Sequence, residues 1–236
     1  MRWVILGATS AIAEAFAHCV AQKGDSLLLV GRDNAALAII QADLHIRYRI
    51  DCTSLQCDFS NNINELLEIL KKDEAELALF IATSHSVPNS ELTTASLQNI
   101  ITVNITHISQ IIQLYFSRQQ IEHRIIFLSS VAACRGRAKN SFYGGSKAAI
   151  ERYLQGLQQS AAVSQHITIA RLGFIDTVQT YGLPGVFYAA APTACAKALW
   201  KASHAGKHLC YYPFFWRIIM GLIGWLPFRI YRKLRF

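Results

Sequence analysis

Short apolar runs alternate with longer amphipathic stretches along this 236-residue chain, and this alternation is its strongest constraint on the fold. The strand-like runs fall at residues 2–6, 26–30, 52–57, 77–82, 124–128 and 167–172. Helix-like stretches lie at residues 11–22, 33–43, 61–72, 93–117 and 142–163. Strands that are apolar on both faces are typical of a parallel sheet covered by helices on each side. The sequence therefore predicts an α/β fold, a single doubly wound (Rossmann) parallel sheet whose ligands bind beyond the carboxyl ends of the strands.

The composition fits one such domain and narrows the chemistry. Hydrophobic residues make up 52% of the chain and charged residues 16%, enough to bury a large core. The six cysteines contain no Cys-x2-Cys pair, so neither a metal site nor a disulfide framework is indicated. We expect reduced thiols in a cytoplasmic protein. Because an apolar run directly follows Met1, we expect no signal peptide.

The net charge of +8 is concentrated at the end of the chain. From Arg217 onward there is no acidic residue, and the basic ones are Arg217, Arg229, Arg232, Lys233 and Arg235. The basic isoelectric point therefore describes a tail and does not indicate nucleic acid binding.

A serine, a tyrosine and a lysine stand at a spacing suited to proton transfer, in the stretch Ser130…Tyr143-Gly-Gly-Ser-Lys147. Residues four apart share one face of a helix, so the Tyr143 phenol and the Lys147 ammonium can address the same volume. The positive charge is expected to lower the pKa of the phenol toward neutrality. A Ser130 hydroxyl could then orient a carbonyl or alcohol against Tyr143. The Tyr-x3-Lys pair alone is a weak signal.

A turn that could hold a phosphate follows the first predicted strand. Gly7-Ala8-Thr9-Ser10 opens the first helix, whose free N–H groups and dipole favour an anion. The alternative is an ordinary strand–helix turn, because Gly7 is its only glycine.

The end of the second strand bears on which dinucleotide would bind. Gly31-Arg32 stands where an NAD site would carry an acidic residue for the ribose hydroxyl. The Arg32 guanidinium suits a phosphate instead, which favours NADP(H) over NAD(H). Arg32 could equally be a solvated turn residue. Asp58, after the third strand, could accept from an adenine amino group or cap a helix beginning near Ser60.

Together with Val103-Asn104 and the Arg171-Leu-Gly-Phe-Ile-Asp-Thr177 segment, these motifs give the chain its family likeness. It resembles the short-chain dehydrogenases/reductases over nearly its whole length. The resemblance implies a catalytic tetrad made of Asn104, Ser130, Tyr143 and Lys147. It also implies cofactor contacts from Gly7, Thr9, Ser10, Ile12, Arg32, Asp58, Tyr143, Lys147 and Thr177.

The resemblance also assigns a role to each of these groups. Tyr143 would be the acid and base, and Ser130 would orient the substrate. Lys147 would tune Tyr143 and hold the nicotinamide ribose hydroxyls. Asn104 would position a water, unless it is a helix-interior amide bonded to backbone. Thr177 would bond the carboxamide or a phosphate, unless it is a helix cap.

The chain departs from the family pattern at three places. Ala11 and Ala13 replace glycines, which puts a β-carbon against the pyrophosphate and the helix–strand contact. Residues 81–85 replace the usual Asn-Asn-Ala-Gly turn, where we expect His85 to face solvent. Leu172 stands in place of a proline before Gly173.

The C-terminal segment 213–236 forms a second part of the chain after a catalytic domain at 1–212. Its dense aromatic and aliphatic residues predict an apolar helical extension, marginal in length for spanning a membrane. With the basic residues that follow, it suits a helix lying in the membrane interface. A subunit interface or a lid over the substrate pocket are the alternatives. The tail is similar to that of a family subgroup working on polyprenyl-phosphate-linked sugars, which implies a lipid-linked or amphipathic substrate.

These expectations converge on an NADP(H)-dependent oxidoreductase acting on a carbonyl or secondary alcohol. We expect it to be cytoplasmic, where the tail would allow a peripheral position on the cytoplasmic face of the membrane. Residues 178–192, with Tyr181, Phe187 and Tyr188, would help to select the substrate. The family resemblance implies a homodimer or homotetramer. The alternatives are a dinucleotide-binding sensor without turnover, which the missing glycines keep open, and a membrane-associated scaffold.

Overall fold

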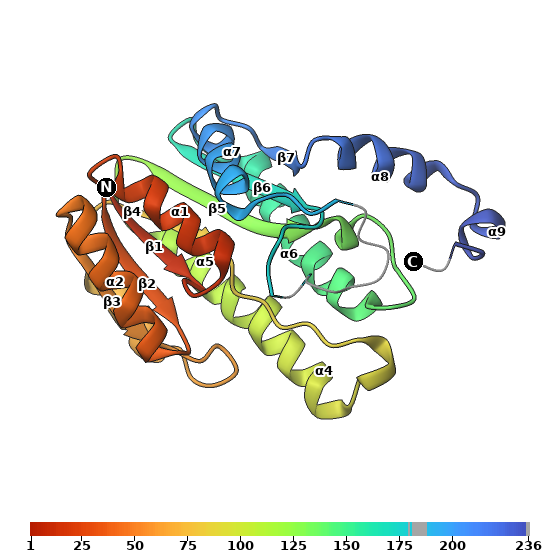
Figure 1. The fold of residues 1–236 in the computed structure, drawn as a ribbon, viewed down its shortest axis with the longest axis horizontal. Helices are drawn as coiled ribbons and strands as arrows, with labels where there is room; N and C mark the ends of the chain where they lie inside the picture. Colours follow the sequence, from red (N-terminus) through yellow and green to blue (C-terminus); the bar gives the residue numbers. More distant parts are fainter. Residues whose placement is uncertain (179, 181–187, 235–236) are drawn as a thin grey trace.

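A seven-stranded parallel sheet forms the centre of the computed structural model, which describes residues 1–178, 180 and 188–234 (Figure 1). The strand order is β3-β2-β1-β4-β5-β6-β7, and every neighbouring pair is parallel. The order reverses between β1 and β4, which makes their carboxyl ends the switch point of the sheet. The strands are β1 Arg2–Leu6, β2 Ser26–Gly31, β3 Cys52–Gln56, β4 Leu77–Ile81, β5 His123–Ser130, β6 Gln165–Leu172 and β7 Leu209–Tyr212.

Helices cover both faces of the sheet because successive strand side chains point to opposite sides. In β1, Trp3 and Ile5 enter one core with residues of α1, α2 and α7, while Val4 and Leu6 enter a second core with residues of α3, α5 and α6. The helices are α1 Ala11–Ala21, α2 Asn34–Tyr48, α3 Asn64–Lys72, α4 Thr94–Ile101, α5 His107–Ser117, α6 Ser141–Ser160, α7 Pro192–His204, α8 Phe215–Trp225 and α9 Phe228–Tyr231.

The predicted doubly wound sheet is confirmed, and the structure adds elements that the sequence pattern did not reveal. The strand β7 pairs with β6 and α7 leads into it. The strand has only four residues, none of them fully buried, and the apolar tail follows it directly. The helix α3 begins at Asn64 rather than at residue 61.

The predicted helix at 93–117 is interrupted by a π-helical segment, Thr102–Thr106, between α4 and α5. Its wider backbone places Asn104 on the buried side, where the side chain is 2% exposed. Such π segments are frequent at functional sites.

The tail packs on the domain through α8. Trp216 and Met220 are buried in a small core with Val131, and Phe174 lies edge-on to Trp216 at 5.7 Å between ring centroids. A β-carbon at Gly173 would come within 1.8 Å of the Trp216 indole nitrogen, so only glycine admits this indole. Among the described residues, we find no helix with the length and apolarity that crossing a membrane requires.

Candidate functional site

The candidate site lies at the carboxyl ends of β1, β4 and β5, which are neighbours in the sheet (Figure 1). Gly7 follows β1, Thr83 and Ser84 follow β4, and Ser130 ends β5. Because these strands are parallel, the three segments meet at one edge. Segments that are distant in the sequence are thereby brought to one edge of the sheet.

Gly7 is required by the backbone at the switch point. Its φ is +81°, and a β-carbon there would come within 2.8 Å of the Thr83 amide nitrogen. Any other residue at position 7 would clash with Thr83. Glycine is therefore what allows the turn after β1 to lie this close to the segment after β4.

The start of α1 has the geometry of an anion-binding helix terminus. Ser10 is the N-cap, and its hydroxyl accepts from the Ala13 amide at 3.3 Å. Thr9 and Ala11 are exposed, while Ile12 is half-buried against the first core. The Ala13 methyl is fully buried in that core, so the helix–strand contact accommodates it. Of the two alanines that replace glycines of the family pattern, only Ala11 therefore has an exposed methyl group.

Arg32 and Asp58 lie near one another at the edge formed by β2 and β3. Arg32 is exposed, and its charge contributes to lowering the pKa of Asp58, after the larger effect of hydrogen bonds from Ser60. Asp58 accepts from the Ser60 amide at 2.9 Å and its hydroxyl at 2.5 Å. These hydrogen bonds stabilise a turn at residues 58–60, whereas α3 begins only at Asn64. The predicted helix beginning near Ser60 is therefore wrong. The neighbouring acid Asp33 caps α2 by accepting from the Ala36 amide.

The Tyr143 phenol lies between two hydroxyls and one cation. Burial raises its pKa, while the neighbouring Ser84 and Ser130 hydroxyls and the charge of Arg137 oppose that rise. The predicted lowering of this pKa toward neutrality is wrong. The sequence spacing places a lysine nearby but does not show how deeply both groups are buried.

Lys147 is 3% exposed, and burial lowers its pKa to about 7. Its amine donates to the Leu128 carbonyl at 2.8 Å and lies 6.0 Å from the centroid of the Tyr143 ring. An amine with this pKa carries less than a full charge near neutrality, which limits its power to lower the pKa of the phenol.

Ser84 is the site residue that sequence reasoning missed. Its hydroxyl oxygen is buried without a hydrogen bond of ordinary geometry, yet it lies close enough to the phenol to lower the pKa of Tyr143. The only signal in the sequence was that residues 81–85 depart from the family turn.

Asn104 links the turn after β4 to α6. Its side chain accepts from the His85 amide at 2.7 Å and donates to the His85 carbonyl at 2.8 Å and the Ser146 hydroxyl at 2.9 Å. Ser146 in turn donates to the Tyr143 carbonyl at 2.8 Å. Both amide protons are thus used inside the protein, and one lone pair of the oxygen remains for a further donor. His85 is half-buried, and its backbone serves this link.

A buried ion pair fixes α6 against the sheet one turn beyond Lys147. Glu151 is 2% exposed and binds the Arg171 guanidinium at 2.5 Å. The Ser129 hydroxyl donates to Glu151 at 2.5 Å, and Arg171 also donates to the Tyr211 hydroxyl at 2.6 Å. Strands β5, β6 and β7 are therefore tied to the helix that carries Tyr143 and Lys147.

The segment after β6 is described only in part. The Thr177 amide donates to the Thr180 hydroxyl at 3.1 Å, so Thr177 belongs to a turn. Tyr188 is half exposed and lies 5.8 Å from the Phe215 ring of α8. The predicted substrate residues Tyr181 and Phe187 lie outside the described residues.

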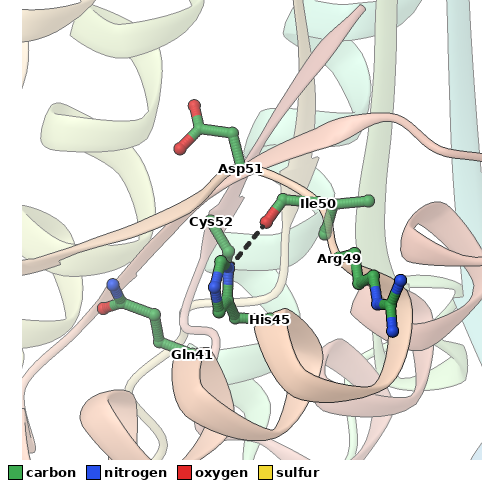
Figure 2. Close-up of a pocket in the computed structure, with 6 residues that line it drawn as sticks. All are labelled: Gln41, His45, Arg49, Ile50, Asp51 and Cys52. Atoms are coloured by element: carbon green, nitrogen blue, oxygen red, sulfur yellow. Dashed lines mark hydrogen bonds between the residues drawn. The ribbon is translucent and has the colours of Figure 1, made fainter.

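A surface hollow of about 520 Å³ lies at the opposite edge of the sheet, where α2 ends and β3 begins (Figure 2). Its lining includes Arg49, Asp51 and His45, whose ring bonds the Ile50 carbonyl at 3.2 Å. Because it adjoins the amino end of β3, this hollow is separate from the candidate site.

Gly144 sets how closely α6 approaches the turn after Ser130. A β-carbon at Gly144 would come within 2.5 Å of the Ala132 carbonyl oxygen, whereas one at Gly145 would meet nothing within 4 Å. Gly144→Ala is expected to shift Tyr143 from Ser130 and to lower kcat/KM by roughly 10- to 100-fold. The matched Gly145→Ala should retain activity and melt at the same or a slightly higher temperature. Equal kinetics for the two variants would contradict this role of Gly144.

The buried lysine makes stability depend on pH. The Lys147 amine titrates near 10.5 when exposed and about 7 when folded, so the unfolded chain binds more protons between these values. The cost of burying Lys147 is therefore full below about pH 7 and fades as the pH rises toward about 10.5. Lys147→Met should relieve roughly 2 to 4 kcal/mol of that cost at low pH and progressively less at high pH.

Urea unfolding of the cofactor-free protein across this pH range measures the effect. Lys71→Met, a change at an exposed position on α3, is the control and should show no such trend. A constant difference between wild type and Lys147→Met would mean that the amine titrates normally in the folded chain.

The fold and the grouped side chains together define a class. A doubly wound parallel sheet binds its ligand at the carboxyl ends of its strands, and a hydroxyl, a phenol and an amine at this edge are groups that can transfer protons. A model of the short chain dehydrogenase family matches residues 2–181. The chain therefore belongs to the short-chain dehydrogenase family, whose members bind a nicotinamide dinucleotide, and it is a dehydrogenase or reductase.

Individual relatives agree with this assignment. An uncharacterized oxidoreductase of Staphylococcus epidermidis is 29% identical over 186 residues, 76% of this chain and 80% of that protein. The very-long-chain 3-oxoacyl-CoA reductase-A of Danio rerio is 27% identical over 172 residues, 66% of this chain and 52% of that protein. A solved short-chain dehydrogenase from Sphingobium yanoikuyae in complex with NADPH has the same fold, with a TM-score of 0.81, 19% identity and 96% of each chain covered.

Proposed function

We propose that this protein is an NADP(H)-dependent oxidoreductase that interconverts a carbonyl and a secondary alcohol. The observation that carries the proposal is the grouping of Ser130, Tyr143 and Lys147 beside the switch point of the sheet. A bound dinucleotide supplies or accepts the hydride.

The residues at the switch point fit such a cofactor. The Gly7 turn leaves no room for a side chain, and the start of α1 offers N–H groups to a pyrophosphate. Thr9, Ser10 and Ile12 would line this end. Lys147 directs one N–H group at Leu128, which leaves at least one more to meet the ribose hydroxyls. Thr177 would bond the carboxamide or a phosphate beyond β6.

The protein's own groups then handle the proton of the substrate oxygen. Ser130 would hold that oxygen, and Tyr143 would give up or take back its proton. Because burial keeps the phenol protonated, Tyr143 is in the state needed to donate, which suits reduction. Asn104 would accept from a water through its remaining lone pair, in a relay toward Lys147.

NADP(H) preference is proposed from Arg32, with Asp58 near the adenine. Arg32→Asp should replace a phosphate-binding fork by a carboxylate that favours a ribose hydroxyl. We expect the ratio of kcat/KM for NADPH to that for NADH to fall by roughly 100-fold. Arg49→Asp, the same change at the opposite sheet edge, is the control. An unchanged ratio would show that Arg32 does not meet the cofactor.

The substrate is proposed to be amphipathic or lipid-linked, and the location to be the cytoplasmic side of a membrane. Supporting observations are the free state of the six cysteines and the apolar, basic tail at 213–236. A homodimer or homotetramer is proposed on the basis of family membership, with 1–212 as the catalytic domain and the tail as its extension.

A steady-state assay tests the function. Oxidation of NADPH is followed with a panel of small ketones and long-chain amphipathic ketones, and NADPH binding is measured by fluorescence on the same protein. Turnover of at least one ketone class supports the proposal. NADPH binding without turnover of any ketone would favour a sensor. The absence of both NADPH binding and turnover would favour a scaffold.

A further inference from the structure

The outward side of the tail carries an apolar surface that the domain does not cover. Phe214, Ile218, Leu222 and Trp225 follow one another at spacings of four, four and three residues, which places them on one face of α8. They are 63%, 59%, 68% and 89% exposed. Phe228, at the start of α9, continues this surface at 71% exposure. We call these five residues the outer tail face.

The helix is fixed in this orientation by its other side. Trp216 and Met220 are buried on the domain, and Trp216 occupies the space above Gly173. The side of α8 that packs on the domain is thus the one carrying Trp216 and Met220, and the outer tail face points away from the domain.

The end of the tail is anchored as well. The Arg135 guanidinium donates to the Ile223 carbonyl and lies 3.8 Å from the centroid of the Tyr231 ring. The Tyr231 hydroxyl donates to the Gly136 carbonyl at 2.5 Å. Figure 1 shows α8 and α9 in blue, running from β7 along one side of the molecule to its end.

The net positive charge of the chain lies in its last quarter, which ends with the tail. After Asp176 the sequence has eight lysines and arginines and no acidic residue, which equals the net charge of the whole chain. The first 176 residues are consequently neutral. Exposed basic residues next to the outer tail face are Arg217, Arg229, Arg232 and Lys233.

We propose that the outer tail face docks on an anionic membrane surface, with α8 lying in the plane of the headgroups. An exposed aromatic and aliphatic stripe flanked by cations matches the two layers of such a surface, acyl chains below and negative headgroups above. The eleven residues of α8 suit lying on this surface.

Charge also favours a membrane over a second copy of the chain as the partner of the outer tail face. A two-fold contact through the outer tail face would use the same patch on both subunits. It would bring the four exposed cations near their own copies, without an acidic residue in either tail to offset them.

The inference deepens the proposed function and rests on it in one respect, the amphipathic substrate. Val131 follows Ser130 directly and shares a core with Trp216 and Met220. The site at the end of β5 therefore adjoins the part of the molecule that meets the membrane, where a carbonyl on a lipid-anchored substrate would be presented.

Vesicle co-sedimentation of the full chain tests the docking. The probes are vesicles of phosphatidylcholine alone and of phosphatidylcholine mixed with phosphatidylglycerol. We expect binding to the mixed vesicles that weakens with added salt, and little binding to the neutral ones. Equal binding to both kinds, or none to either, would overturn the proposal.

Matched variants locate the surface. Leu222→Asp with Trp225→Asp should lower the affinity for mixed vesicles by about 10-fold or more. Ile39→Asp with Ile46→Asp changes two exposed apolar residues of α2 and should have no effect. Arg217→Gln, Arg229→Gln and Arg232→Gln together should weaken binding, unlike Lys197→Gln, Lys201→Gln and Lys207→Gln. Equal losses in a variant and its control would overturn the proposal.

Two further measurements separate the outcomes. If the Leu222→Asp, Trp225→Asp chain has a lower molecular mass in solution than wild type, the face is a subunit contact and the membrane proposal fails. NADPH binding and ketone reduction are followed without vesicles on the same samples. Vesicle binding without turnover would refute the proposed function alone, and turnover without vesicle binding would refute the docking surface alone.

Discussion

Replacing Tyr143 by Phe is expected to lower kcat/KM for ketone reduction by roughly a thousandfold, because it removes the hydroxyl proposed to exchange the proton of the substrate oxygen. The ring itself remains, so the packing of α6 should persist and NADPH affinity should stay close to that of the wild type. Steady-state kinetics and NADPH fluorescence titration measure the two effects separately.

Tyr153→Phe is the matched control, since Tyr153 lies on the same helix and packs against the second core. Its kinetics should stay within about twofold of wild type. Substantial activity in Tyr143→Phe would remove the phenol from the mechanism, and the Ser84 and Ser130 hydroxyls would then need another role.

Gly173→Ala is expected to loosen the tail from the domain. The added methyl would overlap the Trp216 indole, which comes within 1.8 Å of the new carbon, so the indole must leave its place. Overpacking of this kind costs about 1 to 3 kcal/mol, and displacing the indole also exposes Met220 and Val131. We expect a lower melting temperature, faster amide exchange in α8 and a shifted tryptophan fluorescence spectrum.

A double-mutant cycle separates this overlap from a general effect of alanine after β6. Trp216→Ala removes the indole and should cost about 3 kcal/mol by itself. Adding Gly173→Ala to that variant should cost little more, because the clash is gone. Additive losses would indicate that Gly173 is needed for its backbone rather than for the indole.

The layout of the sheet could be predicted because its physical cause is local. Strands buried on both faces must be mainly apolar, and every predicted strand except the partly polar β3 carried that signature. The strand β7 is partly exposed and short, so it carries too little of the pattern to be separated from the tail. The π segment around Asn104 is a backbone adjustment that helical periodicity does not encode.

The candidate site could be predicted as a set of residues but not as an electrostatic environment. Spacing alone placed Tyr143 and Lys147 on one helical face, and the strand order explains how Ser130 reaches them. Depth of burial decides the pKa of both groups, and it depends on the packing of several distant segments. For the same reason the buried Ser84 hydroxyl was not foreseen, since only the fold brings it to the phenol.

The shared packing of Val131 with Trp216 and Met220 has a practical consequence for anyone shortening this chain. Truncation after residue 212 would remove the side chains that pack against the turn holding the Ser130 hydroxyl. It would also leave the space next to Gly173 unfilled. A protein trimmed in this way for better handling would then lose activity for reasons unrelated to lipid. Point substitutions in the outer tail face leave the packing of Trp216 and Met220 on Val131 intact.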